Sequence, residues 1–413
     1  MIEFETFTLD NGLRVIHHYD SLKSSAVLNI LYNVGARDES KDKTGFAHLF
    51  EHLMFGGSEN IPEYDGPLQE AGGQNNAFTT NDLTNYYIQV PVENIETAFW
   101  LESDRMKKLN FSQKSLDVQI GVVIEEFKQR YLNQPYGQAF MHIRSNAYKK
   151  HPYQWPTIGK EIAHIEEAKL ADVVGFFAKF YVPNNAIACV AGNVSLERTK
   201  ELFNKWFSDI SAGGVNKNKY PQEEKQTQPR RFIAPQANSQ KAIYLAFHSC
   251  SRKDKAFYTL DLISDILSNG KNSVFYRKLV DEENIFTNID AYVGEELDPS
   301  LFYISGKIAA NITVEKAESS LWNVIETFKS TAPSESDLAR RKNKLITARK
   351  YQETDLLNKA MALCMAENMG NINLVNTEAD YYNLVSVDDI KAQSNNILTK
   401  ENCTTVVYDK VTQ

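Results

Sequence analysis

The spacing of hydrophobic residues in the first half of the chain changes from every second residue, typical of strands, to the spacing of a helix. FETFTL and LRVIHHY alternate with a period of two around the turn DNG, which predicts a β-hairpin, and the β-rich run AVLNILYNVG predicts a central strand. From residue 45 the spacing is helical, with apolar positions at Phe46, Leu49, Phe50, Leu53 and Met54. Later stretches predict two further helices, VENIETAFWLESDRMKKL and SLDVQIGVVIEEFKQRYLN, and two strands, NNAFTTNDLTNYYIQVP and AIACVAGNV.

The second half repeats this pattern after a polar interruption. Residues 211–240 are rich in Gly, Pro, Asn and Gln, which predicts a linker. Beyond it, KAIYLAFHSC resembles AVLNILYNVG, and FYTLDLISDILSNG resembles FAHLFEHLMFGG. We therefore expect an α+β fold with two homologous domains, 1–210 and 241–413. Each is expected to be an α/β layer, a mixed, mostly antiparallel sheet with helices packed on one face.

The net charge, the cysteine spacing and the lack of long apolar runs argue against several classes of protein. The chain has 413 residues and a net charge of −8, which argues against a general nucleic-acid-binding protein, because such a protein needs a basic face. Its four cysteines are far apart and form no C-x-x-C pair, so we expect free thiols. We see neither a signal peptide nor a membrane-spanning run, so we expect no membrane association and a cytoplasmic location, or a periplasmic one if the chain has been trimmed.

The stretch GFAHLFEHLMFGG places three proton-binding side chains in apolar surroundings. At i and i+4 of a helix, His48 and His52 stack on one face and can bind one ion, and Glu51 leans to the same side. Two neutral imidazoles half fill a tetrahedral zinc site, which a third protein ligand and a water would complete. The alternative is a pair of core histidines satisfied by hydrogen bonds, but the order H-x-x-E-H is that of the inverzincin helix and favours zinc. In the second repeat the related positions hold Asp261, Ser264 and Asp265, so we expect the site in one copy only.

A third ligand is expected from another element. In GVVIEEFKQR, Glu125 and Glu126 follow an apolar run on a predicted helix, where a carboxylate usually needs a cation partner. The residues alone leave open which of the two is the ligand and which lies on a solvated face.

Several motifs together resemble the pitrilysin/insulinase family of zinc metallopeptidases, in the short-chain branch of mitochondrial processing peptidases and their bacterial relatives. They are HLFEHLMFGGSEN, NNAFTTNDLTNYY, VVIEEFKQRYLNQPYG, HPYQWPTIG and FYVPNNAIACVAGNV, and the resemblance covers essentially the whole chain. It implies one zinc ion per chain, with His48, His52 and Glu126 as ligands and Glu51 as the general base. Many relatives have a glutamate where this chain has Gln119, which removes a second carboxylate near the metal.

The resemblance also implies a peptide-binding strand beside the zinc. Asn76, Ala77, Phe78 and Thr79 match the family's edge strand, which can add an extended peptide through main-chain hydrogen bonds. The alternative is an ordinary half-buried strand.

Chain length implies a partner, because two homologous halves enclose a chamber in this family and this chain supplies half of such a clamshell. Active relatives also use an arginine and a tyrosine from the half without metal. The matching positions are Val280 and Thr287, and the nearby Tyr276 and Arg277 fall in a different phase. We therefore expect a heterodimer whose homologous partner supplies the Arg/Tyr pair, with a homodimer as the alternative.

The expected function is a zinc-dependent metalloendopeptidase that hydrolyses unfolded peptides or oligopeptides. Two alternatives are a processing peptidase that cuts leaders or presequences at one site and a non-catalytic scaffold subunit. The intact metal-ligand set argues against the scaffold. Imidazole and carboxylate ligands would also accept Mn or Co.

Overall fold

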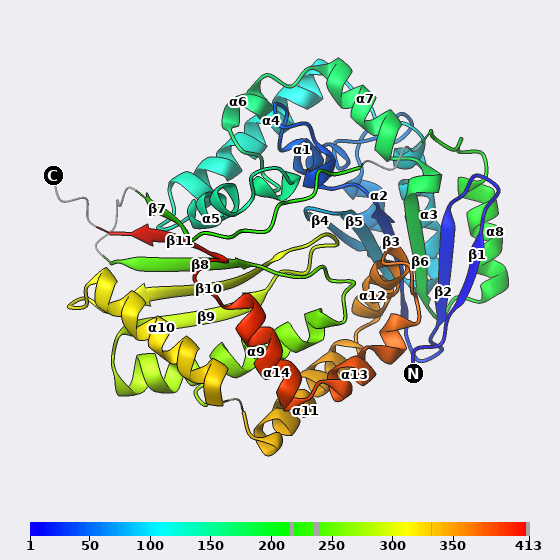
Figure 1. Cartoon of the computed structure of the whole chain (residues 1–413). Coiled ribbons are helices and arrows are strands. Elements are labelled where there is room, and N and C mark those ends of the chain that lie inside the picture. Colours follow the sequence, from blue (N-terminus) through cyan, green and yellow to red (C-terminus); the bar gives the residue numbers. More distant parts are fainter. Residues whose placement is uncertain (215–218, 235–239, 332, 410–413) are drawn as a thin grey trace. The chain divides into compact units, whose positions relative to one another are not determined.

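The chain folds into two compact units that are each assembled from three separate segments. The computed structural model describes residues 1–214, 219–234, 240–331 and 333–409. The first unit comprises Met1–Lys128, Trp155–Tyr220 and Arg349–Thr377. The second comprises Gln129–Gln154, Pro221–Ala348 and the chain from Glu378 on. Figure 1 labels the elements of both units.

The first unit contains a six-stranded mixed sheet of order β1-β2-β6-β3-β5-β4. Its strands are β1 (Glu5–Thr8), β2 (Arg14–Tyr19), β3 (Ser25–Tyr32), β4 (Gln74–Thr79), β5 (Thr84–Pro91) and β6 (Ala186–Gly192). Only β2 and β6 pair in parallel, so the expectation of a mostly antiparallel sheet is confirmed here. Asn29 and Asn85 exchange two buried amide hydrogen bonds of 2.9 and 2.8 Å, which fix the register of β3 on β5.

Helices cover both faces of this sheet. The helices of the first unit are α1 (Phe46–Leu53), α2 (Asp65–Glu70), α3 (Ile95–Lys107), α4 (Gln113–Phe127), α6 (Ile162–Glu166), α7 (Leu170–Phe180), α8 (Leu196–Phe207) and α12 (Leu356–Asn368). Side chains alternate along β3, so Tyr32 lies on the face where Phe50 of α1 stacks on Tyr181. Val27 and Leu31 lie on the other face, in one apolar cluster with α12. The expectation of helices on one face only is therefore wrong for this sheet.

The second unit repeats this arrangement with five strands in the order β7-β11-β8-β10-β9. Its strands are β7 (Arg230–Ala234), β8 (Ala242–His248), β9 (Phe286–Val293), β10 (Leu301–Ile308) and β11 (Cys403–Tyr408). Its helices include α5 (Ala139–Ala147), α9 (Ala256–Ser268), α10 (Val314–Thr331) and α14 (Val387–Ile397). Helices α11 (Glu335–Gln352) and α13 (Leu374–Leu384) each have residues in both units. One face of the sheet packs on α5, and the other packs on α9, α10 and α14.

Short helical turns connect these elements. They are η1 (Ala36–Asp38), η2 (Val92–Asn94), η4 (Pro152–Gln154) and η5 (Pro183–Asn185), with the wider turns η3 (Lys128–Leu132) and η6 (Tyr276–Glu282). All four cysteines are free. Among the described residues, no helix is long and apolar enough to cross a bilayer.

The helix on the second face of each sheet comes from the other half of the sequence. Helix α12 lies beyond the predicted linker yet packs in the first unit, and α5 precedes the linker yet packs in the second. The units therefore differ from the contiguous ranges 1–210 and 241–413. Within the predicted linker, residues 230–234 form strand β7, whereas 215–218 and 235–239 lie outside the described residues.

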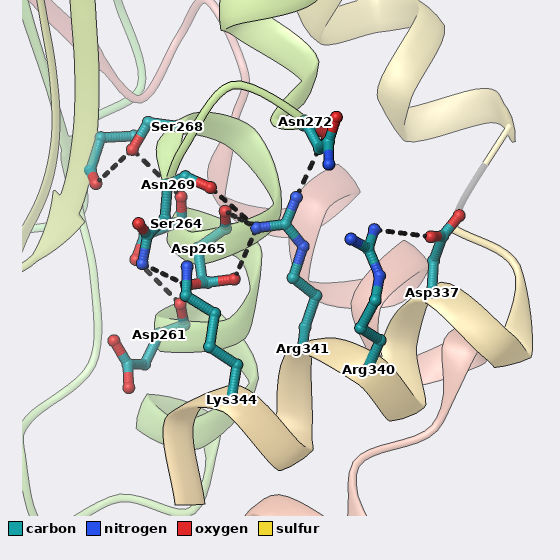
Figure 2. A network of polar contacts seen from close by, with 11 residues as sticks. Asp261, Ser264, Asp265, Ser268, Asn269, Asn272, Asp337, Arg340, Arg341 and Lys344 are labelled. Atoms are coloured by element: carbon teal, nitrogen blue, oxygen red, sulfur yellow. Dashed lines mark hydrogen bonds and ion pairs between the residues drawn. The ribbon is translucent and has the colours of Figure 1, made fainter. Parts of the chain in front are cut away.

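A buried ion pair joins α9 to α11 in the second unit (Figure 2). Arg341 donates to Asp265 Oδ2 at 2.9 Å, and their side chains are 6% and 3% exposed. The same guanidinium donates to the carbonyl oxygens of Asp265, Asn269 and Asn272, near the end of α9, where a cation also meets the negative end of the helix dipole. The hydroxyl of Tyr382 donates to Asp261 Oδ2 at 2.5 Å.

Replacing Leu363 with alanine should show that the first unit depends on α12. This side chain is fully buried against the sheet, so Leu363→Ala should lower the free energy of unfolding by about 2–5 kcal/mol. Urea denaturation followed by circular dichroism measures the change. The control Leu384→Ala removes a side chain that is 75% exposed and should stay within about 0.5 kcal/mol of wild type. Equal stability of both variants would contradict the packing described.

Replacing Arg341 with methionine should destabilise the second unit, because Asp265 would lose its buried cation. The expected loss is about 3–5 kcal/mol in the same denaturation experiment. The neighbouring Arg340 pairs with Asp337 at 2.9 Å, but both side chains are more than half exposed, so Arg340→Met should cost at most about 1 kcal/mol. A cost for Arg341→Met no larger than that of Arg340→Met would rule out a stabilising role for the buried pair.

Candidate metal centre

Helix α1 carries the H-x-x-E-H sequence and is held by its apolar side. Phe46, Leu49, Phe50 and Leu53 are buried, as their spacing predicts. The helix begins after Gly45, whose φ is 90°. A Cβ at this position would lie 2.6 Å from the Ile165 side chain and 2.7 Å from a main-chain carbonyl oxygen, so only glycine fits.

The buried carboxylate of Glu39 fixes the first turn of α1. Its two oxygens accept the N–H groups of Gly45 at 2.9 Å and Ala47 at 2.8 Å. Burial raises the pKa of Glu39, and the two N–H donors act in the opposite direction. Sequence reasoning missed this residue, because it lies outside the position next to the helix start where a cap is expected.

The structure brings His48, His52 and Glu126 together. The two imidazole rings are 4.8 Å apart between centroids. Glu126 Oε2 lies 3.7 Å from His48 Nε2 and 3.4 Å from His52 Nε2. Of all the His, Cys, Asp and Glu residues that the structure describes, these are the only three whose ligand atoms gather closely enough to hold an ion.

Helix α4 decides which of its two adjacent glutamates reaches the histidines. The helix starts at Ser112, whose hydroxyl accepts the Ser115 N–H at 3.1 Å, and it is docked by the buried Leu116, Val123 and Phe127. Glu126 lies beside this buried stripe and is 17% exposed. Glu125 is 62% exposed and pairs with Lys128, so it lies on the solvated side.

The donor set fits a zinc ion. Ligand atoms bound at about 2.0–2.1 Å to one tetrahedral ion lie roughly 3.3 Å apart, close to the two distances from Glu126 Oε2. Two imidazole nitrogens and one carboxylate oxygen are the ligands of many catalytic zinc sites. The three side chains are 13%, 24% and 17% exposed, so the site is partly shielded yet reachable from solvent.

Glu51 lies between His48 and His52 in sequence and contacts the edge strand of the sheet. Its Oε2 accepts a hydrogen bond of 2.6 Å from the Thr79 hydroxyl. Burial raises the pKa values of the Tyr86 and Tyr181 phenols on the same side of the sheet, and the negative charge of Glu51 adds a smaller effect in the same direction. Sequence reasoning did not find either tyrosine, since tyrosines in strands and helices are common core residues.

The strand β4 lies at the sheet edge, as expected for residues 76–79. It pairs with β5 from Gln74 opposite Gln89 to Thr79 opposite Thr84, and it is the terminal strand in the sheet order. Phe78 packs against the apolar cluster under α12. The side-chain oxygen of Asn76 accepts the N–H of Ala77 at 2.8 Å.

The second unit has no comparable ligand set among its described residues. Asp261 and Asp265 stand on α9 but bind Tyr382 and Arg341. At the positions that were compared with the histidines, α9 therefore carries aspartates. One pairs with a guanidinium and the other accepts a hydrogen bond from a phenol.

Val280 and Thr287, the positions matched to the family's Arg/Tyr pair, differ in burial. Val280 is half-buried against the core of the second unit, and Thr287 is exposed on β9 with its hydroxyl 3.3 Å from the Lys307 carbonyl oxygen. Of the residues nearby, Tyr276 is half-buried and Arg277 is exposed. Their proposed relation to a partner stays a prediction.

Two family models match successive parts of the chain. Residues 14–161 match the model described as "Insulinase (Peptidase family M16)", which covers α1 and α4. Residues 168–345 match the model described as "Peptidase M16 inactive domain". Together the two matches span most of the chain.

Individual relatives agree with these matches. The zinc protease PqqE of Helicobacter pylori is 28% identical over 344 residues, which are 82% of this chain and 77% of PqqE. A crystal structure of a protease from Helicobacter pylori superimposes with a TM-score of 0.92 at 25% identity, over 99% of this chain and all of that one. The periplasmic protease PqqL of Escherichia coli has the same fold, with a TM-score of 0.80 at 17% identity, and this chain covers 48% of it.

The family matches, the two-sheet fold and the zinc-protease relatives agree with the gathering of His48, His52 and Glu126. The chain belongs to the insulinase family of peptidases, M16.

Proposed function

We propose that this protein is a zinc-dependent metalloendopeptidase that hydrolyses unfolded peptides. One observation carries the proposal: three donor atoms of His48, His52 and Glu126 lie within 4.8 Å of one another, where α4 meets α1, and α1 also presents Glu51. The two imidazoles and the carboxylate are brought together at the cost of partial desolvation, and a bound cation would offset that cost.

Glu51 is the proposed general base. A zinc ion held by the three ligands would supply Lewis acidity, which makes a water more acidic and polarises the peptide carbonyl. Glu51 takes a proton from the attacking water and later donates it to the leaving amine. Glu51 lies at i+3 from His48 and next to His52, so it projects from the same part of α1 as the two histidines. Its carboxylate is not among the three gathered donors, and we therefore assign it to the water rather than to the ion.

The edge of β4 is the proposed substrate site. A peptide added there as an extra strand would be bound mainly through its main chain, by residues 76–79, beside the metal ligands. This mode requires an extended substrate, which favours unfolded peptides over folded proteins. Main-chain recognition also tolerates many sequences, so a degrading peptidase is favoured over a processing peptidase that cuts one site.

We further propose that the active form is a dimer of homologous chains. PqqL is about twice as long as this chain, which matches 48% of it, so a longer relative joins two such lengths in one polypeptide. A valine at 280 and a threonine at 287 cannot replace an arginine and a tyrosine in binding a substrate. A homologous partner that supplies this pair is therefore favoured over a homodimer.

Metal content should depend on the three ligands and on no neighbouring carboxylate. His52→Ala and Glu126→Ala should weaken zinc binding by more than about 100-fold, since loss of even an outer partner costs about 10–100-fold. Glu125→Ala removes an adjacent but exposed glutamate and should retain the metal. Competition with a chelating dye measures the affinities. Unchanged zinc binding in Glu126→Ala would contradict the proposed site.

Peptidase activity should require Glu51. Glu51→Gln should keep the zinc and lower kcat by about 100–10,000-fold, the usual contribution of a general base. A quenched, unfolded peptide is the probe, with this chain assayed alone and mixed with a homologous subunit lacking the H-x-x-E-H sequence. We expect activity in the mixture only. Strong activity of this chain alone, lost in Glu51→Gln, would retain the peptidase and refute the heterodimer. Zinc binding without activity in any mixture would favour the scaffold alternative.

A further inference from the structure

The contact between Thr79 and Glu51 joins two parts of the candidate site that the proposed mechanism treats separately. Thr79 is the last residue of the edge strand β4, and Glu51 lies in the middle of α1. The hydroxyl of Thr79 donates to Glu51 Oε2 at 2.6 Å, and the contact is partly buried. This is a short hydrogen bond to a carboxylate, which belongs to the stronger class.

The pairing of β4 with β5 directs the Thr79 side chain toward α1. Opposed residues of antiparallel strands share a face, so Thr79 lies on the same side as Thr84, and Ala77 lies on the same side as the buried Tyr86. Tyr86 lies on the α1 side of the sheet, because its ring contacts Tyr181, on which Phe50 of α1 stacks. Phe78 points to the opposite face and packs against the cluster under α12, which holds β4 against rotation about its own axis.

A glutamate on a helix needs such an anchor if it is to act as a base. Its backbone is fixed by α1, but three side-chain torsions remain: χ1 and χ2 can each adopt several staggered values, and χ3, which turns the carboxylate, has only a broad preference. A hydrogen bond to one carboxylate oxygen fixes the plane of the group and with it the direction of the other oxygen. Proton transfer requires heavy atoms about 2.6–3.2 Å apart, so an orientation error of an ångström matters.

We propose that Thr79 is a positioning residue for Glu51, an inference that rests on the proposed peptidase function. Thr79 holds the carboxylate of the base in the orientation that it needs for the water and the leaving amine. A peptide bound along β4 forms main-chain hydrogen bonds to the strand that ends in Thr79. The scissile bond and the base are thereby placed from one common element, the backbone of β4.

The alternative role of Thr79 is purely structural, a link that stabilises α1 against β4. The two roles predict different kinetics. Loss of a structural link would change stability, or KM and kcat together, whereas loss of a positioning contact lowers kcat and leaves KM and metal binding unchanged. Retention of the hydroxyl in serine should rescue a positioning role.

The test compares three substitutions. Thr79→Val replaces the hydroxyl with a methyl group and keeps the β-branched shape of a strand residue, Thr79→Ala repeats the loss with a smaller side chain, and Thr79→Ser keeps the hydroxyl. Thr8→Val is the matched control, because Thr8 is the last residue of β1, the strand at the opposite edge of the same sheet, and is exposed. Each variant is assayed with the quenched peptide under the conditions in which wild type is active.

We expect kcat to fall about 10–100-fold in Thr79→Val and Thr79→Ala, with KM within about 2-fold and unchanged zinc content. Thr79→Ser and Thr8→Val should remain within about 3-fold of wild type. Equal losses in the serine and valine variants, or full activity of both Thr79→Val and Thr79→Ala, would overturn the inference.

Crystal structures of metal-free wild type and Thr79→Val provide a readout that needs no activity. We expect the Glu51 carboxylate to leave its wild-type orientation in the variant, while His48, His52 and Glu126 stay in place. An unmoved Glu51 in the variant would overturn the inference even if Glu51→Gln proves the peptidase function. A reoriented Glu51 in a protein that cleaves no peptide would uphold the positioning contact and remove the proposed function.

Discussion

The carboxylate of Glu39 fixes where helix α1 begins, and that helix carries three residues of the candidate metal centre, His48, Glu51 and His52. By accepting the N–H groups of Gly45 and Ala47, it satisfies donors that would otherwise be buried without partners. The apolar side of α1 then packs on the aromatic cluster around Tyr181. With the start and rotation of α1 both fixed, the polar side faces α4 and β4, and three weakly solvated ligands can be held in one place.

The two units solve the same packing problem with different chemistry. In the first, two histidines of α1 face a glutamate of α4, the set that we propose binds a cation from solution. In the second, Asp265 of α9 faces Arg341 of α11, so the cation is a side chain of the protein itself. A nearby cation stabilises a partly or fully desolvated carboxylate in either case. The described residues of the second unit contain no comparable group of metal-ligand side chains, and most of that unit before residue 346 lies within the match of residues 168–345 to the model described as an inactive domain.

Predictions from the sequence were reliable for features that depend on residues close together in the chain, because helical and strand periodicities are local patterns. The spacing of His48 and His52 determines their common face on any helix, and the Thr, Tyr and Phe residues of NNAFTTNDLTNYYIQVP predicted β structure where β4 and β5 lie. The choice between Glu125 and Glu126 depended on how α4 docks, which the residues alone left open. The exchange of α5 and α12 between the halves could not be predicted, because an apolar helix side does not specify which sheet it covers. Strand β7 was missed because a short stretch of RRFIA lay among linker-like residues.

The contact of Thr79 with Glu51 shows why the orientation of Glu51 depends on an element other than its own helix. The i, i+4 spacing places two ligands with little freedom, because both rings must meet one point. Glu51 shares their helix, whose geometry fixes its backbone but not the torsions of its side chain. A donor from β4 supplies that direction, and β4 also presents the main-chain edge proposed for the substrate. Substrate position and base orientation then vary together if β4 shifts, which keeps the reacting groups aligned through small movements of the strand.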